Sequence, residues 1–299
     1  MPGTGGEPTN HPDFLGIVAA FRSAGMEVGI CTNATTLDSG TIGELARLQV
    51  RCNVSLDGFA EHSHSRFRAR PGAFVETVAT VRALAAAGIL QGLLCTPNNL
   101  AGNQEYAQLC AFAREVGARY VLLNPLGSMG RGVQAQRGLA KSMAHMQQIH
   151  ALTAAFDGPE LDIAHIRFPN PDGKPLAGCE AGTILYVFTL GEVTVCPYLV
   201  FAARTPGSQH PDTEFIVGNI FTDADLAGRL ENYRFHDRYQ LGANPTCGSC
   251  AVNSDYGKGC PAAVIAAGGR IGELDAEQCP RESILPSQAG RRLLPLMPA

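Results

Sequence analysis

Six of the ten cysteines in this sequence fall into two linked groups whose spacing could hold metal. In the downstream group, Cys247, Cys250 and Cys260 follow the pattern C-x2-C-x5-Y-x3-C, with Cys279 beyond it. In the upstream group, eleven residues, one glycine and four residues separate Cys179 from Cys196. Short Gly-rich loops let several thiolates point toward one centre, because no helix or strand splays them apart. The spacing therefore predicts iron–sulfur or other metal sites in the C-terminal part of the chain.

The N-terminal sequence indicates that the cysteines lie in a reducing compartment. The N-terminus has neither a charged region followed by an apolar one nor another secretory signal, and we expect a cytoplasmic protein. Disulfides are rare in the cytosol, which favours metal binding for the six grouped cysteines. The other four lie in apolar segments and are expected to be buried as small hydrophobic residues; they are Cys31, Cys52, Cys95 and Cys110.

Composition limits the class of protein and its partners. The chain has 299 residues, of which 45% are hydrophobic and 17% charged, as in a soluble globular protein with a sizeable core. A formal net charge of -4 with scattered Lys and Arg argues against a nucleic-acid partner. No apolar run reaches the roughly 18 residues that a membrane span needs, so no membrane association is expected.

The elements needed to position these residues follow a repeated order of helix, glycine and short apolar strand. Helices ending near Gly25, Gly88 and Gly117 alternate with strands predicted over 28–31, 52–55, 90–95 and 120–123. A further helix over 143–156 and a strand over 162–168 are expected, after which short strands, turns and cysteines begin near residue 174. The pattern predicts an α/β fold with a parallel sheet in an open or partial barrel over residues 1–170, and a small cysteine-rich domain over 171–299.

Polar residues follow four of the predicted strands, at the edge where parallel sheets gather their chemistry. These ends are Thr32-Asn33, Ser55 to Gly58, Thr96 to Asn99 and Asn124-Pro125. Asn, Asp, Gly and Pro are also ordinary turn residues. A binding site and plain turn chemistry therefore both remain open from these residues alone.

Taken together, the cysteine spacing resembles the SPASM or twitch auxiliary domain of radical SAM enzymes. The N-terminal part resembles the same family: Gly5-Gly6-Glu7-Pro8 matches a GGEP motif, Thr32-Asn33 a TNG-like strand end, and His64-x3-Arg68 an HDxxR segment. The resemblance implies a partial parallel (β/α) barrel of radical SAM type that binds S-adenosylmethionine. The cofactor-binding residues that it implies are Gly5, Gly6, Glu7, Pro8, Asn33, Ser55, Asp57 and Arg68.

The implied roles agree with the chemistry of the side chains. Glu7 would accept hydrogen bonds from the methionine ammonium of the cofactor, and Arg68 would offer its planar guanidinium to the carboxylate. The strand end from Ser55 to Asp57 would meet the ribose. An arginine in a loop before a helix is otherwise usually a solvated or ion-paired surface residue.

The sequence departs from the family at its N-terminus. The CxxxCxxC that holds the radical-generating cluster should lie roughly 30–50 residues before GGEP, on the loop after the first strand. Here GGEP begins at residue 5, so this motif and the first strand are expected to be missing. A misassigned start or a fragment, half of a split or decayed enzyme, and a pseudoenzyme that keeps its binding parts are three alternatives.

The family's ligand pairing implies two auxiliary [4Fe–4S] clusters with three cysteines each. Cys179, Cys196 and Cys260 would hold one, and Cys247, Cys250 and Cys279 the other. Tyr256 stands where the run should supply a cysteine, and Gly173 stands where another is expected. Asp255 or Tyr256 could complete the second cluster and Asp172 the first, or substrate could take the open iron. Zinc held by three thiolates and one oxygen or nitrogen ligand is an alternative.

Two functions follow from the resemblance. The first is a radical SAM oxidoreductase that modifies a peptide or small precursor through a 5′-deoxyadenosyl radical, with an electron donor as partner. The second is a non-catalytic metal-cluster protein that binds a peptide or partner. Without CxxxCxxC, the chain as numbered is not expected to cleave S-adenosylmethionine.

Overall fold

The computed structural model describes residues 2–3, 6–130, 132–168, 178–251, 253 and 257–279, with side chains from Gly6 onward. Two compact units form within these residues. Of the described residues, the N-terminal unit comprises those up to 126 together with 138–168, and the C-terminal unit comprises those within 127–137 and from 178 to 279. None of the helices in this described part combines the length and hydropathy that a bilayer crossing requires.

The N-terminal unit is built on a six-stranded sheet in the order β1-β2-β3-β4-β5-β6. Each neighbouring pair is parallel, as expected for strands separated by helices. The strands are β1 (Pro2–Gly3), β2 (Gly29–Thr32), β3 (Arg51–Ser55), β4 (Leu90–Cys95), β5 (Tyr120–Leu123) and β6 (Asp162–His165). Because the strands run parallel, all their carboxyl ends lie along one edge of the sheet.

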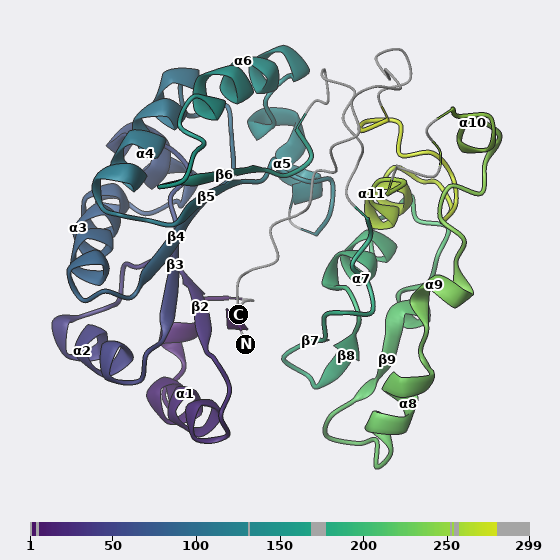
Figure 1. Ribbon diagram of the computed structural model, residues 1–299, viewed down its shortest axis with the longest axis horizontal. Helices are drawn as coiled ribbons and strands as arrows, with labels where there is room; N and C mark the ends of the chain where they lie inside the picture. The colour runs from purple at the N-terminus through teal and green to yellow at the C-terminus, as the bar shows by residue number, and fades with distance from the viewer. Residues whose placement is uncertain are drawn as a thin grey trace. The chain divides into compact units, whose positions relative to one another are not determined.

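Helices cover the outer face of this curved sheet (Figure 1). They are α1 (Phe14–Ser23), α2 (Ser39–Arg47), α3 (Ala73–Ala86), α4 (Asn103–Glu115) and α6 (Met143–Ala154). Their apolar faces pack on buried strand residues such as Ile30, Val54, Leu93 and Val121. The short helix η1 (Pro8–Asn10) and the π-helical turn η2 (Glu61–Ser65) lie in loops after strands. α5 (Gly132–Leu139) falls at the sequence boundary between the two units.

Four of these helices end in the same backbone motif. The two residues after each helix cap donate N–H groups back to the last turn, as Gln49 does to Ala46 and Val50 to Leu45 after α2. The first of the two has a positive φ in every case: Gly25 (79°), Gln49 (53°), Gly88 (72°) and Gly117 (71°). Gln49 alone among these four carries a Cβ in the left-handed region, where an L-residue is strained.

On the face of the sheet away from the helices, β3 and β5 carry buried polar side chains. The Tyr120 hydroxyl donates a 2.6 Å hydrogen bond to Oδ1 of Asn53, and both side chains are buried. Between them lies Gly92, where a Cβ would stand 2.7 Å from the Tyr120 ring. The glycine therefore lets the ring cross β4 and reach Asn53.

The C-terminal unit contains an antiparallel sheet in the order β7-β8-β9 and several short helices. Its strands are β7 (Tyr186–Val187), β8 (Glu192–Thr194) and β9 (Ile216–Asn219). Its helices are α7 (Pro197–Ala203), η3 (Asp212–Phe215), α8 (Leu226–Asn232), α9 (Phe235–Arg238), α10 (Pro245–Gly248) and α11 (Pro261–Ala266). A second apolar core that includes Leu199, Phe215, Phe235 and Ile265 holds these elements together.

The predicted fold class is confirmed: a parallel α/β sheet of alternating strands and helices forms as the glycine-ended units indicated. Strand 120–123 was predicted to the residue, and strand 90–95 likewise. Helix α5 and the π-helical turn η2 were not predicted, because neither shows a regular apolar period. The four cysteines expected to be buried are not equivalent: Cys52, Cys95 and Cys110 are buried, but Cys31 is only half-buried.

The exceptional residue among the helix ends gives a test of the fold. We expect Gln49→Gly to raise the free energy of unfolding by about 1 kcal/mol, because glycine adopts the left-handed conformation without strain. The side chain is exposed, and the hydrogen bond that it makes within the described residues is accepted from Arg22 at the surface. The urea midpoint of the full chain measures the effect.

The matched control is Gly88→Ala, at the same position after α3. No heavy atom lies within 4 Å of a Cβ built there, so only backbone strain changes, and stability should fall by a similar amount. A Gln49→Gly protein that unfolds at lower urea than the parent would contradict the interpretation.

Candidate functional site

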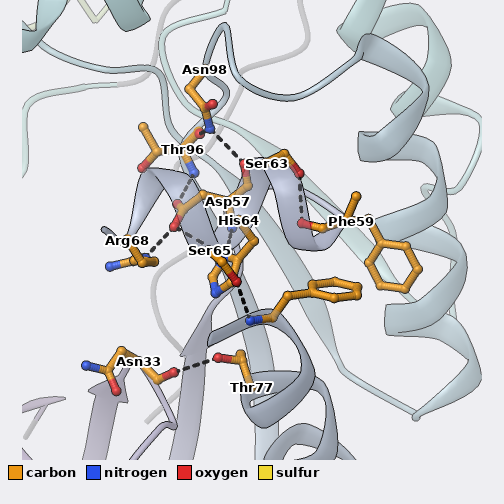
Figure 2. Close-up of polar contacts among 12 residues, drawn as sticks. Asn33, Asp57, Phe59, Ser63, His64, Ser65, Arg68, Thr77, Thr96 and Asn98 are labelled. Atoms are coloured by element: carbon orange, nitrogen blue, oxygen red, sulfur yellow. Dashed lines mark hydrogen bonds and ion pairs between the residues drawn. The ribbon is translucent and has the colours of Figure 1, made fainter. Parts of the chain in front are cut away.

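The ends of β3 and β4 are joined by a buried polar network centred on Asp57 (Figure 2). Its Oδ2 lies 2.6 Å from a terminal nitrogen of Arg68, and its Oδ1 accepts a 2.9 Å hydrogen bond from the Thr96 backbone. The Asp57 side chain is 1% exposed and that of Arg68 is 32% exposed. Burial raises the pKa of the Asp57 carboxyl, and the Arg68 charge and the Thr96 amide oppose that shift.

The turn η2 brings Arg68 to this position. Its His64 is buried, and the Nδ1 atom accepts a 3.1 Å hydrogen bond from the Asp57 backbone N–H. A neutral ring therefore carries its proton on Nε2. Burial and then the charge of Arg68 lower the pKa of His64 to about 4. His64 thus positions the Asp57 backbone as a neutral residue at physiological pH.

Asn98 ties the loop after β4 to the loop after β3. Its side-chain amide donates hydrogen bonds to the backbone oxygens of Asp57 (2.7 Å) and Thr96 (3.0 Å). The Tyr106 hydroxyl on α4 accepts a 2.8 Å bond from the Asn98 backbone N–H. Asn98 and Tyr106 have no exposed surface. Hydrogen bonds on both sides of Asp57, together with the ion pair to Arg68, fix the place of the carboxylate at the centre of the network.

Glu7 joins the loop before α1 to the end of β2. Its Oε1 accepts hydrogen bonds from the hydroxyls of Thr32 (2.6 Å) and Thr9 (2.8 Å), and its Oε2 accepts one from the Asn33 backbone (2.7 Å). A carboxylate oxygen has two lone pairs, so Oε2 keeps capacity for one more donor. The residue is half-buried, which leaves that capacity within reach of a ligand.

Asn33 is held by three groups. Its Oδ1 accepts hydrogen bonds from the backbone (3.0 Å) and hydroxyl (2.8 Å) of Thr35, and its backbone oxygen accepts one from Thr77 on α3 (3.0 Å). In Figure 2 the side-chain nitrogens of Asn33 and Arg68 point to the same side of the strand ends. Hydrogen-bond donors from two neighbouring loops therefore face one region.

The remaining N-terminal candidates contribute less to this geometry. Gly6 is exposed with φ of 90°, and Pro8 begins η1. Ser55 is the last residue of β3 and half-buried, two residues before Asp57. Gly5 lies outside the described residues. The structure thus brings Asp57 to Arg68, and Glu7 to Asn33.

Three of the six grouped cysteines lie near one another in the C-terminal unit. Burial raises the pKa of Cys179 to about 12, and the nearby thiols of Cys196 and Cys260 add to that shift. Burial likewise raises the pKa of Cys196, with a further contribution from Cys260. All three side chains pack against the apolar core of the C-terminal unit, as thiols around one centre would. This is the trio that the family's ligand pairing assigned to one cluster.

The other trio is less closely defined. Cys247 lies on α10, where its N–H bonds to Asn244 and its sulfur lies 3.4 Å from the Asn244 side-chain nitrogen. Cys250 donates to the Cys247 backbone oxygen, and Cys279 to that of Asp275. Asp275 also accepts a bond from Cys260. Within the described residues, no group of three or more His, Cys, Asp and Glu side chains is arranged to hold a single metal ion.

Four positions offered as possible fourth ligands or substitutes lie outside the described residues. They are Asp172, Gly173, Asp255 and Tyr256. A [4Fe–4S] cluster binds its thiolates to different irons, so its ligands need not converge on one point. The Cys179, Cys196 and Cys260 trio fits such a group by donor type and proximity.

The internal hydrogen-bond partners of the site could not be predicted from the sequence. Thr96 and Asn98 were noted as polar residues at a strand end, but their bonds to Asp57 were not expected. The hydrogen bond from the Asn98 backbone to the Tyr106 hydroxyl was not expected either. An asparagine at a strand end followed eight residues later by a tyrosine on a helix, as with Asn98 and Tyr106, is a weak signal of such a network. Without the fold it does not show that the two side chains meet.

Comparison with known proteins supports the same family. Residues 3–104 match the family described as the Radical SAM superfamily. The chain is 33% identical over 132 residues to the AdoMet-dependent heme synthase of Methanosarcina barkeri, which covers 43% of this chain and 37% of that protein. It is 26% identical to the mycofactocin maturase MftC of Mycobacterium tuberculosis over 97% of this chain and 73% of MftC. The chain thus spans well under half of the heme synthase.

A solved structure has the same fold over most of the chain. The crystal structure of Streptococcus suis SuiB bound to S-adenosylmethionine superposes with a TM-score of 0.66 at 14% identity, over 92% of this chain and 65% of SuiB. SuiB bound to its precursor peptide SuiA superposes with a TM-score of 0.56 at 14% identity, over 90% of this chain and 63% of SuiB. The family match thus shows a Radical SAM domain over residues 3–104, and the SuiB structure shows the same fold over most of the chain.

Proposed function

We propose that the chain works in a radical SAM enzyme that modifies a peptide or small precursor. The polar strand ends of the N-terminal unit would bind S-adenosylmethionine, and the cysteine trios of the C-terminal unit would hold auxiliary iron–sulfur clusters. The observation that carries this proposal is the joint placement of an acceptor, Glu7, and a cation, Arg68, at strand ends within the residues that match the superfamily.

An amino-acid zwitterion suits this pair of groups. The free acceptor position on Oε2 of Glu7 would take a hydrogen bond from the ammonium of the methionine part. The guanidinium of Arg68 uses one terminal nitrogen for Asp57, and its other donors can bind a carboxylate. Asn33 would add an amide donor between them. When it is bound and then reductively cleaved by one electron, S-adenosylmethionine supplies a 5′-deoxyadenosyl radical that removes a hydrogen atom from the substrate.

The peptide substrate is inferred from relatives. MftC is named a mycofactocin maturase, and SuiB has been solved with a precursor peptide, so maturation of a peptide is the substrate class that these likenesses favour. Bound auxiliary clusters would relay an electron or bind substrate. The sequence contains no CxxxCxxC, and we therefore expect the chain alone to bind S-adenosylmethionine without cleaving it.

Arg68→Gln tests the cofactor site. The variant should weaken binding of S-adenosylmethionine by about 10- to 100-fold, because a charge-assisted pair with the carboxylate is lost. Equilibrium dialysis of the full chain with labelled cofactor measures the Kd, and its melting temperature shows whether it is folded.

The matched control is Arg66→Gln, two residues earlier on the same segment. Arg66 is exposed, and its guanidinium makes no ion pair in the described part of the chain. Its replacement should leave the Kd within about twofold. Equal losses in both variants would show a general effect of charge and contradict a specific role for Arg68, while absence of binding by the parent would contradict the proposed function.

Cys196→Ala tests the auxiliary clusters. Anaerobic reconstitution of the parent should give about eight irons per chain and a broad brown absorption, and the variant should lose about half of that iron. Cys110→Ala, at a buried cysteine of α4, is the control and should keep the full amount. Colourless parent protein that retains zinc would favour the zinc alternative.

A further inference from the structure

Asp57 is a buried carboxylate whose cationic partner among the described residues is Arg68. Its side chain is 1% exposed, and Arg68 contacts Oδ2 at 2.6 Å. The backbone amide of Thr96 supplies a neutral hydrogen bond to Oδ1. A buried charge is stable only while it is paired and hydrogen-bonded. The ionised state of Asp57 therefore depends on how fully Arg68 is available to it.

The other titratable groups that face Asp57 are neutral. On the η2 side, the His64 Nδ1 is 3.9 Å from Oδ2 but accepts the Asp57 N–H, and burial holds its pKa near 4. On β4 and α4, burial raises the pKa of the Cys95 thiol and of the Tyr106 phenol, and the charge of Asp57 adds to both shifts. Of the described groups that face Asp57, Arg68 is thus the one cation.

The carboxylates in the next layer around Asp57 cannot take the place of Arg68 as its cationic partner. Glu61 accepts a hydrogen bond from the Gly72 backbone and faces His64. Glu105 accepts bonds from the backbone of Phe59 and the hydroxyl of Ser63. Both are acidic, so they add negative charge around the site. They cannot compensate Asp57 if Arg68 is drawn away.

Arg68 is open to a second anion. With 32% of its side chain exposed, it contacts Asp57 from one side and meets solvent on the other. A ligand carboxylate bound there would make two carboxylates share one guanidinium. The ligand's group remains partly hydrated, but Asp57 cannot reach water. The buried carboxylate is then the one that takes a proton.

We propose that a carboxylate-bearing ligand binds at Arg68 together with one proton, which is taken up by Asp57. The inference rests on the proposed function, in which the ligand is the amino-acid part of S-adenosylmethionine. The negative charge of the ligand carboxylate is balanced by the positive charge of the proton that binds with it, so the site gains no net negative charge. Affinity is highest at low pH and falls by up to about tenfold per pH unit between the pKa of Asp57 in the free and in the bound protein.

Calorimetric titration of the full chain with S-adenosylmethionine tests this. Titrations at one pH in phosphate and in Tris differ in heat by the protons exchanged times the difference in buffer ionisation enthalpy. We expect net uptake approaching one proton per ligand, and none with decarboxylated S-adenosylmethionine. No binding overturns the proposed function and this inference together. Binding with equal heats in both buffers overturns this inference alone.

Asp57→Asn separates the proton from the ligand contact. The amide imitates the protonated carboxyl, so the variant should bind with no proton uptake and with a Kd independent of pH. Asp38→Asn, at the exposed N-cap of α2, is the control and should keep the uptake of the parent, since asparagine also caps helices. Proton uptake that persists in folded Asp57→Asn overturns the assignment of the proton to Asp57. If that variant does not fold, the comparison of the two buffers on the parent protein still tests the proposal.

Discussion

The buried network around Asp57 sets the geometry of the N-terminal unit at the carboxyl ends of its strands. Four contacts from two segments meet there: the His64 ring and the Arg68 guanidinium from the η2 segment, and the Thr96 amide and the Asn98 side chain from the loop after β4. A parallel sheet supplies no hydrogen bonds beyond its last paired residues, so the loops after β3 and β4 need other partners. The carboxylate and the backbone of Asp57 supply them.

The energetics of this network indicate function more than stability. A buried ion pair loses about as much in desolvation as it gains in attraction, and apolar residues of similar volume often serve stability as well or better. The core on the helix side of the sheet needs no such pair, since it is built from residues such as Leu45, Val54 and Leu93. The pair is asymmetric, with Asp57 hidden and Arg68 partly exposed. That arrangement keeps a cation fixed at a surface where an anion can reach it.

The regular helices and strands could be predicted from the sequence because local signals, such as turn residues and apolar runs, determine them. Gly88 after α3, Gly117 after α4 and the apolar run before each polar loop were enough to place β4 and β5 to the residue. The Asp57–Arg68 pair could not be predicted, because ten residues that include a π-helical turn lie between the two positions and sequence spacing does not give the direction of the side chains. An arginine matched to a ligand-binding motif looks the same whether it meets a ligand or an internal carboxylate.

The alternation within β3 held a second signal. Cys52 and Val54 enter the core, whereas Asn53 and Ser55 lie on the other face, so the strand alternates although buried parallel strands are usually continuous in hydrophobicity. Asn53 is buried, its Oδ1 accepts a hydrogen bond from Tyr120, and its side chain also lies against the Cys31 thiol. Gly92 has no side chain, which lets Tyr120 reach Asn53 across β4. An apolar residue at position 53 would need neither partner, so the residues of these strands keep a polar pair on a face that apolar packing alone would not require.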